Sequence, residues 1–111
     1  MRKIYRLSDN KDFVVVYKKG KSTANRFFVL YVYKRMDSGP FRLGVSISKK
    51  IGNAVTRNRI KRLVKAVFLD FECDLPVGYD LVVISRTGAR HINFYQAKDA
   101  LSQLFKRSRI I

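Results

Sequence analysis

Short apolar runs and strict alternation of apolar with polar positions mark the predicted strands of this chain. Residues 26–34 are β-branched or aromatic on both faces, which favours a strand covered on both sides. Residues 41–48 alternate cleanly and are predicted to pair with the first strand in a hairpin. Residues 79–85 predict a short central strand, and residues 21–24 are a possible short extra strand.

The first of three predicted helices is expected to begin after Ser8, as N-cap, and to end near Lys19, before Gly20. Its three consecutive valines, residues 14–16, favour a strand locally, because β-branched side chains are stiff at χ1. We interpret the segment as a helix despite them.

The second helix is predicted to run from Asn53, a suitable N-cap, to about Phe71. The third is predicted to open at Asn93, with Gln96 three residues later as in a capping box. Apolar residues recur in both at the spacing of a core-facing stripe. These residues are Ile60, Leu63, Val64, Val67, Phe68 and Phe71 in the second helix, and Ala97, Ala100, Leu101, Leu104 and Phe105 in the third.

Together these elements predict the α/β (α+β) class: a two-layer sandwich of one sheet, with about four strands, packed with three helices in the order αβ(β)βαβα. The length of 111 residues fits a single domain over residues 1–111. A hydrophobic fraction of 47% supplies enough apolar surface for a compact core, so the chain is not a disordered basic tail.

Charge changes this picture most. The net charge is +16, from 24 Lys and Arg against 8 Asp and Glu, which favours a polyanionic partner. Nucleic acid is the first candidate and an anionic membrane surface the second. Cys73 is the single cysteine, which agrees with a reducing compartment, and no signal peptide or membrane-length apolar segment is present. A cytoplasmic protein without membrane association is expected.

The positive charge is concentrated on the second predicted helix and the loop before it. Seven basic residues lie between Lys49 and Lys65, and no Asp or Glu occurs from Ser38 to Leu69. At about 100° per residue, the polar side of this helix adjoins its apolar stripe. The simplest alternative is a merely solvated face, but no interspersed acids balance the charge. Basic side chains on a rigid helix can follow the phosphates of a nucleic acid.

Aromatic residues form a second candidate surface. Phe13 and Tyr17 are four residues apart on the first predicted helix, and Tyr31 and Tyr33 share one face of the first long strand. Exposed aromatic rings can stack unpaired bases at roughly 1–3 kcal/mol each. The alternative is ordinary core beneath a covering helix, and the pattern leaves both open.

Catalytic chemistry is hard to find in this chain. His91 is the only histidine and is interpreted as a loop residue. Ser46 and Lys49 match a short acyl-enzyme spacing that chance also produces. The acidic residues Asp70, Glu72 and Asp74 do not face one another on a helix and predict a solvated helix end rather than a metal site. No catalytic residue and no metal ligand is therefore predicted.

At this point residues 46–68 can be compared with a known pattern. The run Ser-x-Ser-Lys-Lys-Ile-Gly-Asn-Ala-Val-x-Arg-Asn-Arg-Ile-Lys-Arg closely resembles the signature of the bacterial ribonuclease P protein subunit, whose core is Arg57-Asn58-Arg59. Shorter matches occur in the right order along nearly the whole chain. They are Asp12-Phe13, Tyr17-Lys18-x-Gly20, Ala24-Asn25-Arg26, Phe28-Val29-Leu30-Tyr31 and Leu104-Phe105-Lys106-Arg107.

The resemblance implies the protein component of a ribonucleoprotein endonuclease that removes the 5′ leader from precursor tRNA. It implies that the RNA subunit holds the catalytic Mg²⁺, that the protein is an accessory subunit with no cofactor of its own, and that it is monomeric within the particle. It also implies a left-handed βαβ crossover around the signature helix, against the usual right-handed rule.

Two sets of site residues follow from the resemblance. Contacts to the catalytic RNA subunit are expected from Lys49, Lys50, Asn53, Arg57, Asn58, Arg59, Lys61, Arg62 and Lys65. A cleft for the single-stranded leader is expected to be lined by Phe13, Tyr17, Val29 and Tyr31. Without the resemblance, a ribosomal or chaperone-like RNA-binding protein is the next hypothesis, and a protein nuclease acting alone is the third.

Overall fold

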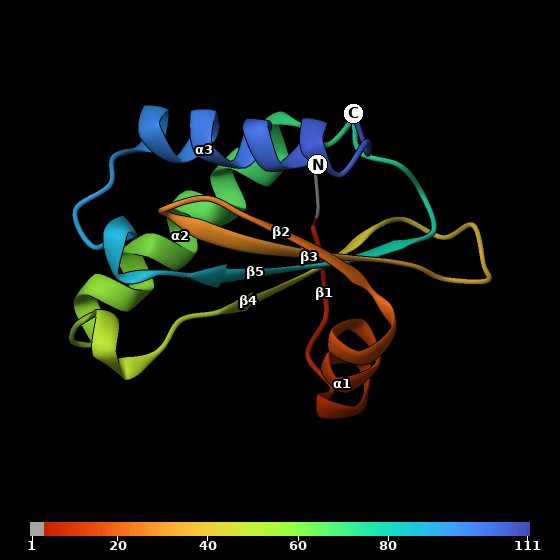
Figure 1. Cartoon of the computed structure of the whole chain (residues 1–111), viewed down its shortest axis with the longest axis horizontal. Coiled ribbons are helices and arrows are strands. Elements are labelled where there is room, and N and C mark those ends of the chain that lie inside the picture. The colour runs from red at the N-terminus through yellow and green to blue at the C-terminus, as the bar shows by residue number, and fades with distance from the viewer. Residues whose placement is uncertain (1–3) are drawn as a thin grey trace.

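The protein is described by a computed structural model, which places residues 4–111. Within them one five-stranded sheet carries helices on both faces (Figure 1). The strands are β1 (Tyr5–Arg6), β2 (Lys21–Ala24), β3 (Phe28–Lys34), β4 (Arg42–Ser46) and β5 (Tyr79–Ser85). The helices are α1 (Asn10–Lys19), α2 (Ala54–Asp70) and α3 (Phe94–Arg107), with short 3₁₀ turns η1 (Lys49–Ile51) and η2 (Thr87–Ala89).

The strand order is β1-β4-β5-β3-β2, with β4 parallel to both β1 and β5, and β3 antiparallel to both β5 and β2. The predicted hairpin of residues 26–34 and 41–48 is therefore wrong, since β5 lies between these two strands. The physical reason is burial: Leu81, Val82 and Val83 are fully buried, and only a central position covers both faces of such a strand. The fifth strand, β1, has only two residues and so carries no sequence period that could predict it.

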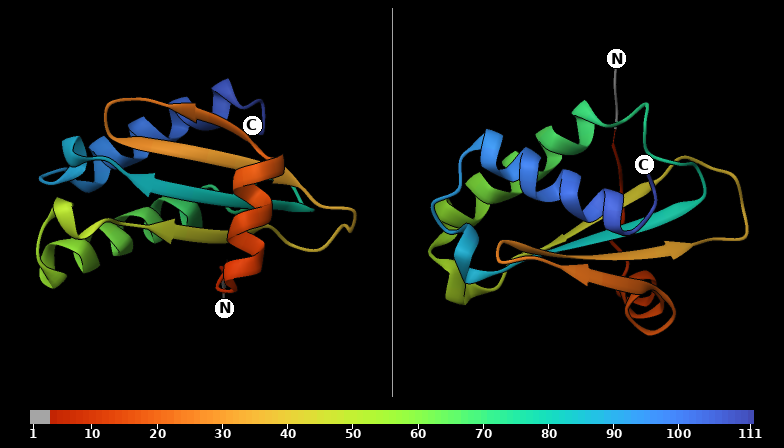
Figure 2. Two further views of the ribbon diagram at one scale, coloured as in Figure 1. Left: turned by 60° about the horizontal axis from the view of Figure 1, so that its bottom comes forward. Right: turned by 45° about the horizontal axis from the view of Figure 1, so that its top comes forward.

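Two parallel neighbours, β4 and β5, are joined through α2, and the connection is left-handed. In the left view of Figure 2 both strands point left, β5 lies above β4, and α2 lies behind the sheet while α1 lies in front. A chain that runs along β4, returns behind the sheet and then moves up to β5 follows a left-handed path. The rare handedness implied by the resemblance is thus present, against a strong general preference for the right hand.

The main core lies between α2, α3 and one face of the sheet, which we call the closed face (Figure 1). Phe68 of α2 packs edge-to-face against Phe105 of α3 at 5.1 Å between ring centroids, and both are fully buried. The predicted stripes supply this core, with Ile60, Val64 and Val67 also buried. The predicted class, one sheet packed with three helices, is confirmed; α2 and α3 form one helical layer, and α1 lies alone on the other face.

The opposite, open face is covered only by α1. Val16 of α1 is fully buried against Val82 of β5 and Leu7, and this small cluster is all that α1 contributes to the core of the described residues. The N-cap of α1 is Asp9 rather than the predicted Ser8, because the Asp9 carboxylate accepts a hydrogen bond from the Lys11 backbone N–H at 3.3 Å. An aspartate also interacts favourably with the positive end of the helix dipole.

Apart from the start of α1, the predicted helix caps are present. Gly20 closes α1, where a Cβ would lie 2.5 Å from the Val16 carbonyl oxygen, so a larger residue does not fit. The Asn53 side chain accepts from the Thr56 N–H at 3.0 Å at the start of α2. Asn93 and Gln96 form the reciprocal capping box at the start of α3. The starts of α2 and α3 are therefore determined by capping residues close to them in the sequence.

Candidate nucleic-acid interface

Three of the aromatic residues predicted to line a leader cleft lie side by side on the open face. The rings of Tyr17 and Tyr31 meet edge-to-face at 5.0 Å between centroids, and Phe13 lies 6.2 Å from Tyr17. Val29 is on the same face of β3 as Tyr31, two residues earlier, and pairs in register with Ile84. We call Phe13, Tyr17, Val29 and Tyr31 the aromatic surface.

The aromatic surface is partly open because α1 is short. Its ten residues bury Val16, whereas Tyr17 remains 38% exposed and Phe13, Val29 and Tyr31 are half-buried. The two alternatives left open by the sequence therefore each describe one part of the helix: Val16 is core, and the rings beside it form an accessible rim. Half-exposed rings can present a π-face to a base, as fully buried rings cannot.

Two small residues of β4 shape this surface, and the sequence did not single them out. Gly44 lies under Phe13, where a Cβ would come within 2.6 Å of the ring, so the glycine lets the ring approach the sheet. Ser46 hydrogen-bonds the phenol of Tyr17. Burial raises the pKa of Tyr17, the bond with Ser46 opposes that rise, and Tyr31 adds to it. A glycine inside an alternating strand was the available signal for a close approach.

The basic residues predicted to contact an RNA subunit form a second surface, which comprises η1, the start of α2 and its outward side. Their side chains are exposed except for those of Arg57 and Arg59, which are half-buried. We call this set the basic surface: Lys49, Lys50, Asn53, Arg57, Asn58, Arg59, Lys61, Arg62 and Lys65. In the part of the chain that the structure describes, no ion pair joins any of its seven cations to a carboxylate.

Arg57 and Arg59 differ from the other members. The Arg59 guanidinium donates to the backbone carbonyl of Ile92 at 2.6 Å and to that of Arg90, which ties α2 to the loop before α3. Part of its donor capacity is thus used within the protein. The Nε of Arg57 is buried and has no hydrogen-bond partner among residues 4–111. A buried polar atom without a partner is costly to the folded state.

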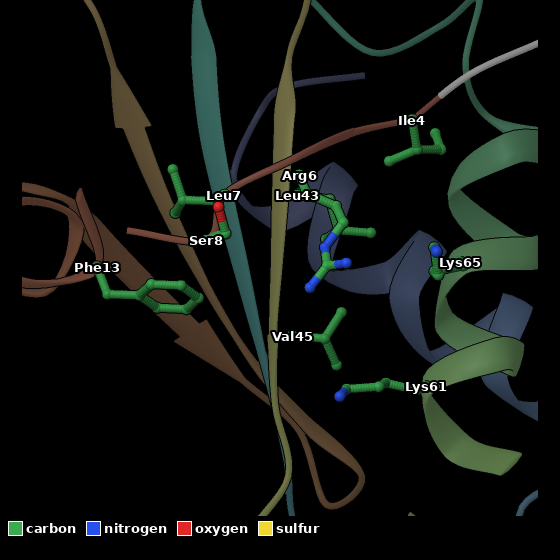
Figure 3. A pocket seen from close by; sticks show the side chains of 9 residues that line it. All are labelled: Ile4, Arg6, Leu7, Ser8, Phe13, Leu43, Val45, Lys61 and Lys65. Atoms are coloured by element: carbon green, nitrogen blue, oxygen red, sulfur yellow. The ribbon is translucent and has the colours of Figure 1, made fainter. Parts of the chain in front are cut away.

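A pocket of about 280 Å³ connects the two surfaces at the β1 edge of the sheet. Figure 3 shows Lys61 and Lys65 of α2 on one side of β4 and Phe13 on the other, with Arg6 of β1 between them. Leu43 and Val45 of β4 form part of its apolar wall. The pocket brings three cations together over an apolar floor, a combination that suits a sugar–phosphate backbone.

Two arginines outside the basic surface, Arg35 and Arg42, are neutralised by carboxylates, unlike the seven cations of the basic surface. The buried Asp80 carboxylate accepts from Arg35 and from Arg42, each at 2.7 Å at the shortest. The guanidinium of Arg35 also hydrogen-bonds the exposed Asp37 and lowers the pKa of that carboxyl. Asp80 hydrogen-bonds Arg42 and raises its pKa. This network fixes the loop between β3 and β4 and leaves the α2 cations without acidic partners.

The described residues hold no group of three or more His, Cys, Asp or Glu side chains placed to bind a metal ion. None of the helices in residues 4–111 is long and apolar enough to cross a bilayer. His91 is exposed in the loop before α3, as the sequence predicted for a loop residue.

Comparison with known proteins decides the family. The family model described as ribonuclease P matches residues 1–109. The chain belongs to the bacterial ribonuclease P protein family. It is 43% identical over 111 residues to the ribonuclease P protein component of Brevibacillus brevis, which covers all of this chain and 88% of the relative. The protein component of Shouchella clausii is 45% identical over 111 residues, with 100% and 91% covered.

Solved structures of the family agree with this fold. The RNase P protein of Staphylococcus aureus superposes with a TM-score of 0.89 at 40% identity, covering 97% of this chain and 98% of that one. The RNase P protein of Thermotoga maritima gives 0.83 at 34% identity, covering 96% and 97%. The basic and aromatic surfaces thus belong to a protein component of a tRNA-processing ribonucleoprotein.

Proposed function

We propose that this protein binds the catalytic RNA of ribonuclease P through the basic surface and the single-stranded 5′ leader of precursor tRNA through the aromatic surface. The observation that carries the proposal is the separation of these surfaces. Seven cations that pair with no carboxylate among residues 4–111 lie on η1 and α2, whereas the half-exposed rings lie on the open face of the sheet. One small protein can thereby contact two RNA segments at once.

The two surfaces suit different RNA structures. Cations fixed along a helix follow the phosphates of a folded RNA, where release of counterions favours binding. Rings on a sheet need bases that are free to stack, which a single-stranded leader offers and a duplex does not. The mature tRNA lacks the leader, so the aromatic surface would favour substrate over product.

The protein acts in this proposal as an accessory subunit. In this proposal the chemistry is carried out by Mg²⁺ held by the RNA subunit, and the described residues hold no group of three or more His, Cys, Asp or Glu placed to bind a metal ion. The protein would work as a monomer within the particle, in the cytoplasm, and would neutralise repulsion between two polyanions.

A reconstitution assay tests the proposal. Precursor tRNA cleavage is measured at low Mg²⁺ with the protein alone, with a ribonuclease P RNA alone and with both. The expected result is that cleavage either requires both components or is far faster with both than with the RNA alone. Cleavage by the protein alone would favour an independent nuclease, and no stimulation of the RNA would contradict the proposal. If about six cations neutralise phosphates, RNA affinity should fall with salt at a log–log slope of about −4 to −5.

A further inference from the structure

A second hollow, of about 620 Å³, lies beneath the C-terminal end of α3 and is lined by neither the basic nor the aromatic surface. The end of α1, the edge strand β2, the end of β3 and the start of β5 form its other walls. Val32 and Tyr79, which pack against the main core, line it together with Tyr33, which packs against the small cluster of the open face, so it lies at one end of the sheet where the two faces meet. We call this hollow the α3 pocket.

The charge of the α3 pocket has one sign. Five of its lining residues are cationic and none is acidic: Lys19, Lys21, Lys34, Arg107 and Arg109. Within residues 4–111 none of the five forms an ion pair with a carboxylate. Like charges gathered around one hollow repel each other unless an anion lies between them. The pocket therefore offers a site for one or more phosphate groups, and Tyr33 and Tyr79 also line it.

Two of these cations are fixed by the end of α3. Arg107 donates to the carbonyl of Ala24 at 2.8 Å, which anchors its guanidinium against the end of β2. Arg109 occupies a left-handed conformation with φ of 58°. It stands at the C′ position of a Schellman motif, because the Ile110 N–H bonds the Phe105 carbonyl and the Arg109 N–H bonds the Lys106 carbonyl.

Glycine is the residue that this C′ position favours, since a Cβ is strained at positive φ. An arginine there costs conformational energy, and Arg109 is one of the residues that line the pocket. This backbone feature points to the same conclusion as the charge, independently of it.

We propose that the α3 pocket binds phosphate groups of an RNA backbone, as a third RNA contact separate from the basic and aromatic surfaces. The choice of RNA rests on the proposed function. The phosphates could belong to the RNA subunit or to precursor tRNA, which share this chemistry.

The first experiment replaces two pocket cations and compares the result with a matched change elsewhere. The double variant Lys21→Gln, Lys34→Gln loses two charges in the pocket. The control Lys11→Gln, Lys106→Gln loses the same two charges from exposed positions outside it. Association with a ribonuclease P RNA is measured across salt concentrations, and precursor tRNA binding is measured with the assembled holoenzyme at saturating protein.

The pocket variant is expected to lose about tenfold in affinity at moderate salt and to flatten the log–log slope by about 1.4–1.8, as for two lost phosphate contacts. The control is expected to change much less. A loss in RNA-subunit association assigns the phosphates to that RNA, and a loss only in the holoenzyme arm assigns them to precursor tRNA. Equal changes in both double variants would overturn the proposal, because only net charge would then matter.

The second experiment uses Arg109→Gly, for which stability and binding should move in opposite directions. Glycine relieves the strained φ, so the thermal midpoint Tm should rise, while RNA affinity should fall by several-fold. If Arg109 has only a structural role, the Arg109→Gly variant will show a higher Tm and an unchanged RNA affinity. That result would overturn the assignment of Arg109 to the site.

Two further results keep this proposal distinct from others. If the pocket variants lose binding to anionic phospholipid vesicles while their RNA affinity is unchanged, the RNA proposal is overturned in favour of a membrane surface. A wild-type protein that binds ribonuclease P RNA no better than an unrelated structured RNA would instead contradict the proposed function, whatever the pocket variants do.

Discussion

Among residues 4–111, the core on the closed face of the sheet, which α2 and α3 cover, contains twenty buried hydrophobic residues, whereas the cluster that α1 completes on the open face contains three. The same sheet thus has one face that holds the fold together and one that is largely spared this task. Side chains on the open face can stay half-exposed without loss of the main core. The aromatic surface is free to bind a partner because most of the buried apolar side chains lie on the other face, under α2 and α3.

The largest expected effect tests the closed face. Phe68→Ala removes a fully buried ring that packs against Phe41 and Phe105, so the free energy of unfolding should fall by about 3–5 kcal/mol. Urea unfolding followed by far-ultraviolet circular dichroism measures it. Tyr31→Ala on the open face is the comparison and should cost clearly less. Equal losses would mean that the two faces contribute alike.

The second prediction tests the open face as a binding surface. Tyr31→Ala removes a ring from the aromatic surface and should weaken precursor tRNA binding by roughly 1–3 kcal/mol, the worth of one stacked base, while mature tRNA binding stays unchanged. Titration of the holoenzyme with both RNAs measures the difference. Tyr95→Ala, which removes an exposed tyrosine of α3, is the control and should change neither. Equal losses for both RNAs would place Tyr31 in the core instead.

The third prediction concerns the outward side of α2. The helix covers the closed face, but the side chains on its outward side are not part of the core. Arg57→Ala, Arg62→Ala should weaken association with the RNA subunit by about tenfold and flatten its log–log salt slope by nearly two. Stability should change little, because Arg62 is exposed and Arg57 leaves behind no broken hydrogen bond at Nε. Unchanged affinity at moderate salt would refute the assignment of both arginines.

The smallest effect is a titration on the open face. Burial raises the pKa of Tyr17 above its ordinary value of 10.0, against the opposing hydrogen bond with Ser46. A raised pKa means that the folded state holds the proton more tightly. The stability linked to this group is therefore complete below about pH 10 and lost as pH rises through the raised value. Phenolate absorbance, compared with that of Tyr17→Phe, measures the shift. A Tyr17 that titrates at its ordinary value would show a fully solvated open face.

Several elements could be predicted from residues close together in the sequence, and others could not. The apolar stripes of α2 and α3, the caps at Asn53 and Asn93, and the bounds of β5 are set by residues close in sequence, and all were predicted. The hairpin prediction failed because strand pairing depends on which strand buries both faces, and β5 arrives from 33 residues beyond the end of β4. Ser8 was predicted as a cap because serine and aspartate serve equally well, and only the backbone geometry selected Asp9.

The site divides in the same way. The sequence by itself determined the density of positive charge on α2, the stripe that must be buried, and the family through its signature. Only the tertiary structure decided that Tyr17 contacts Tyr31, that the Arg59 guanidinium donates to backbone carbonyls, and that five cations from distant segments line the α3 pocket. The physical reason is that charge and period are local properties, whereas these contacts depend on how strands and helices far apart in the chain pack together.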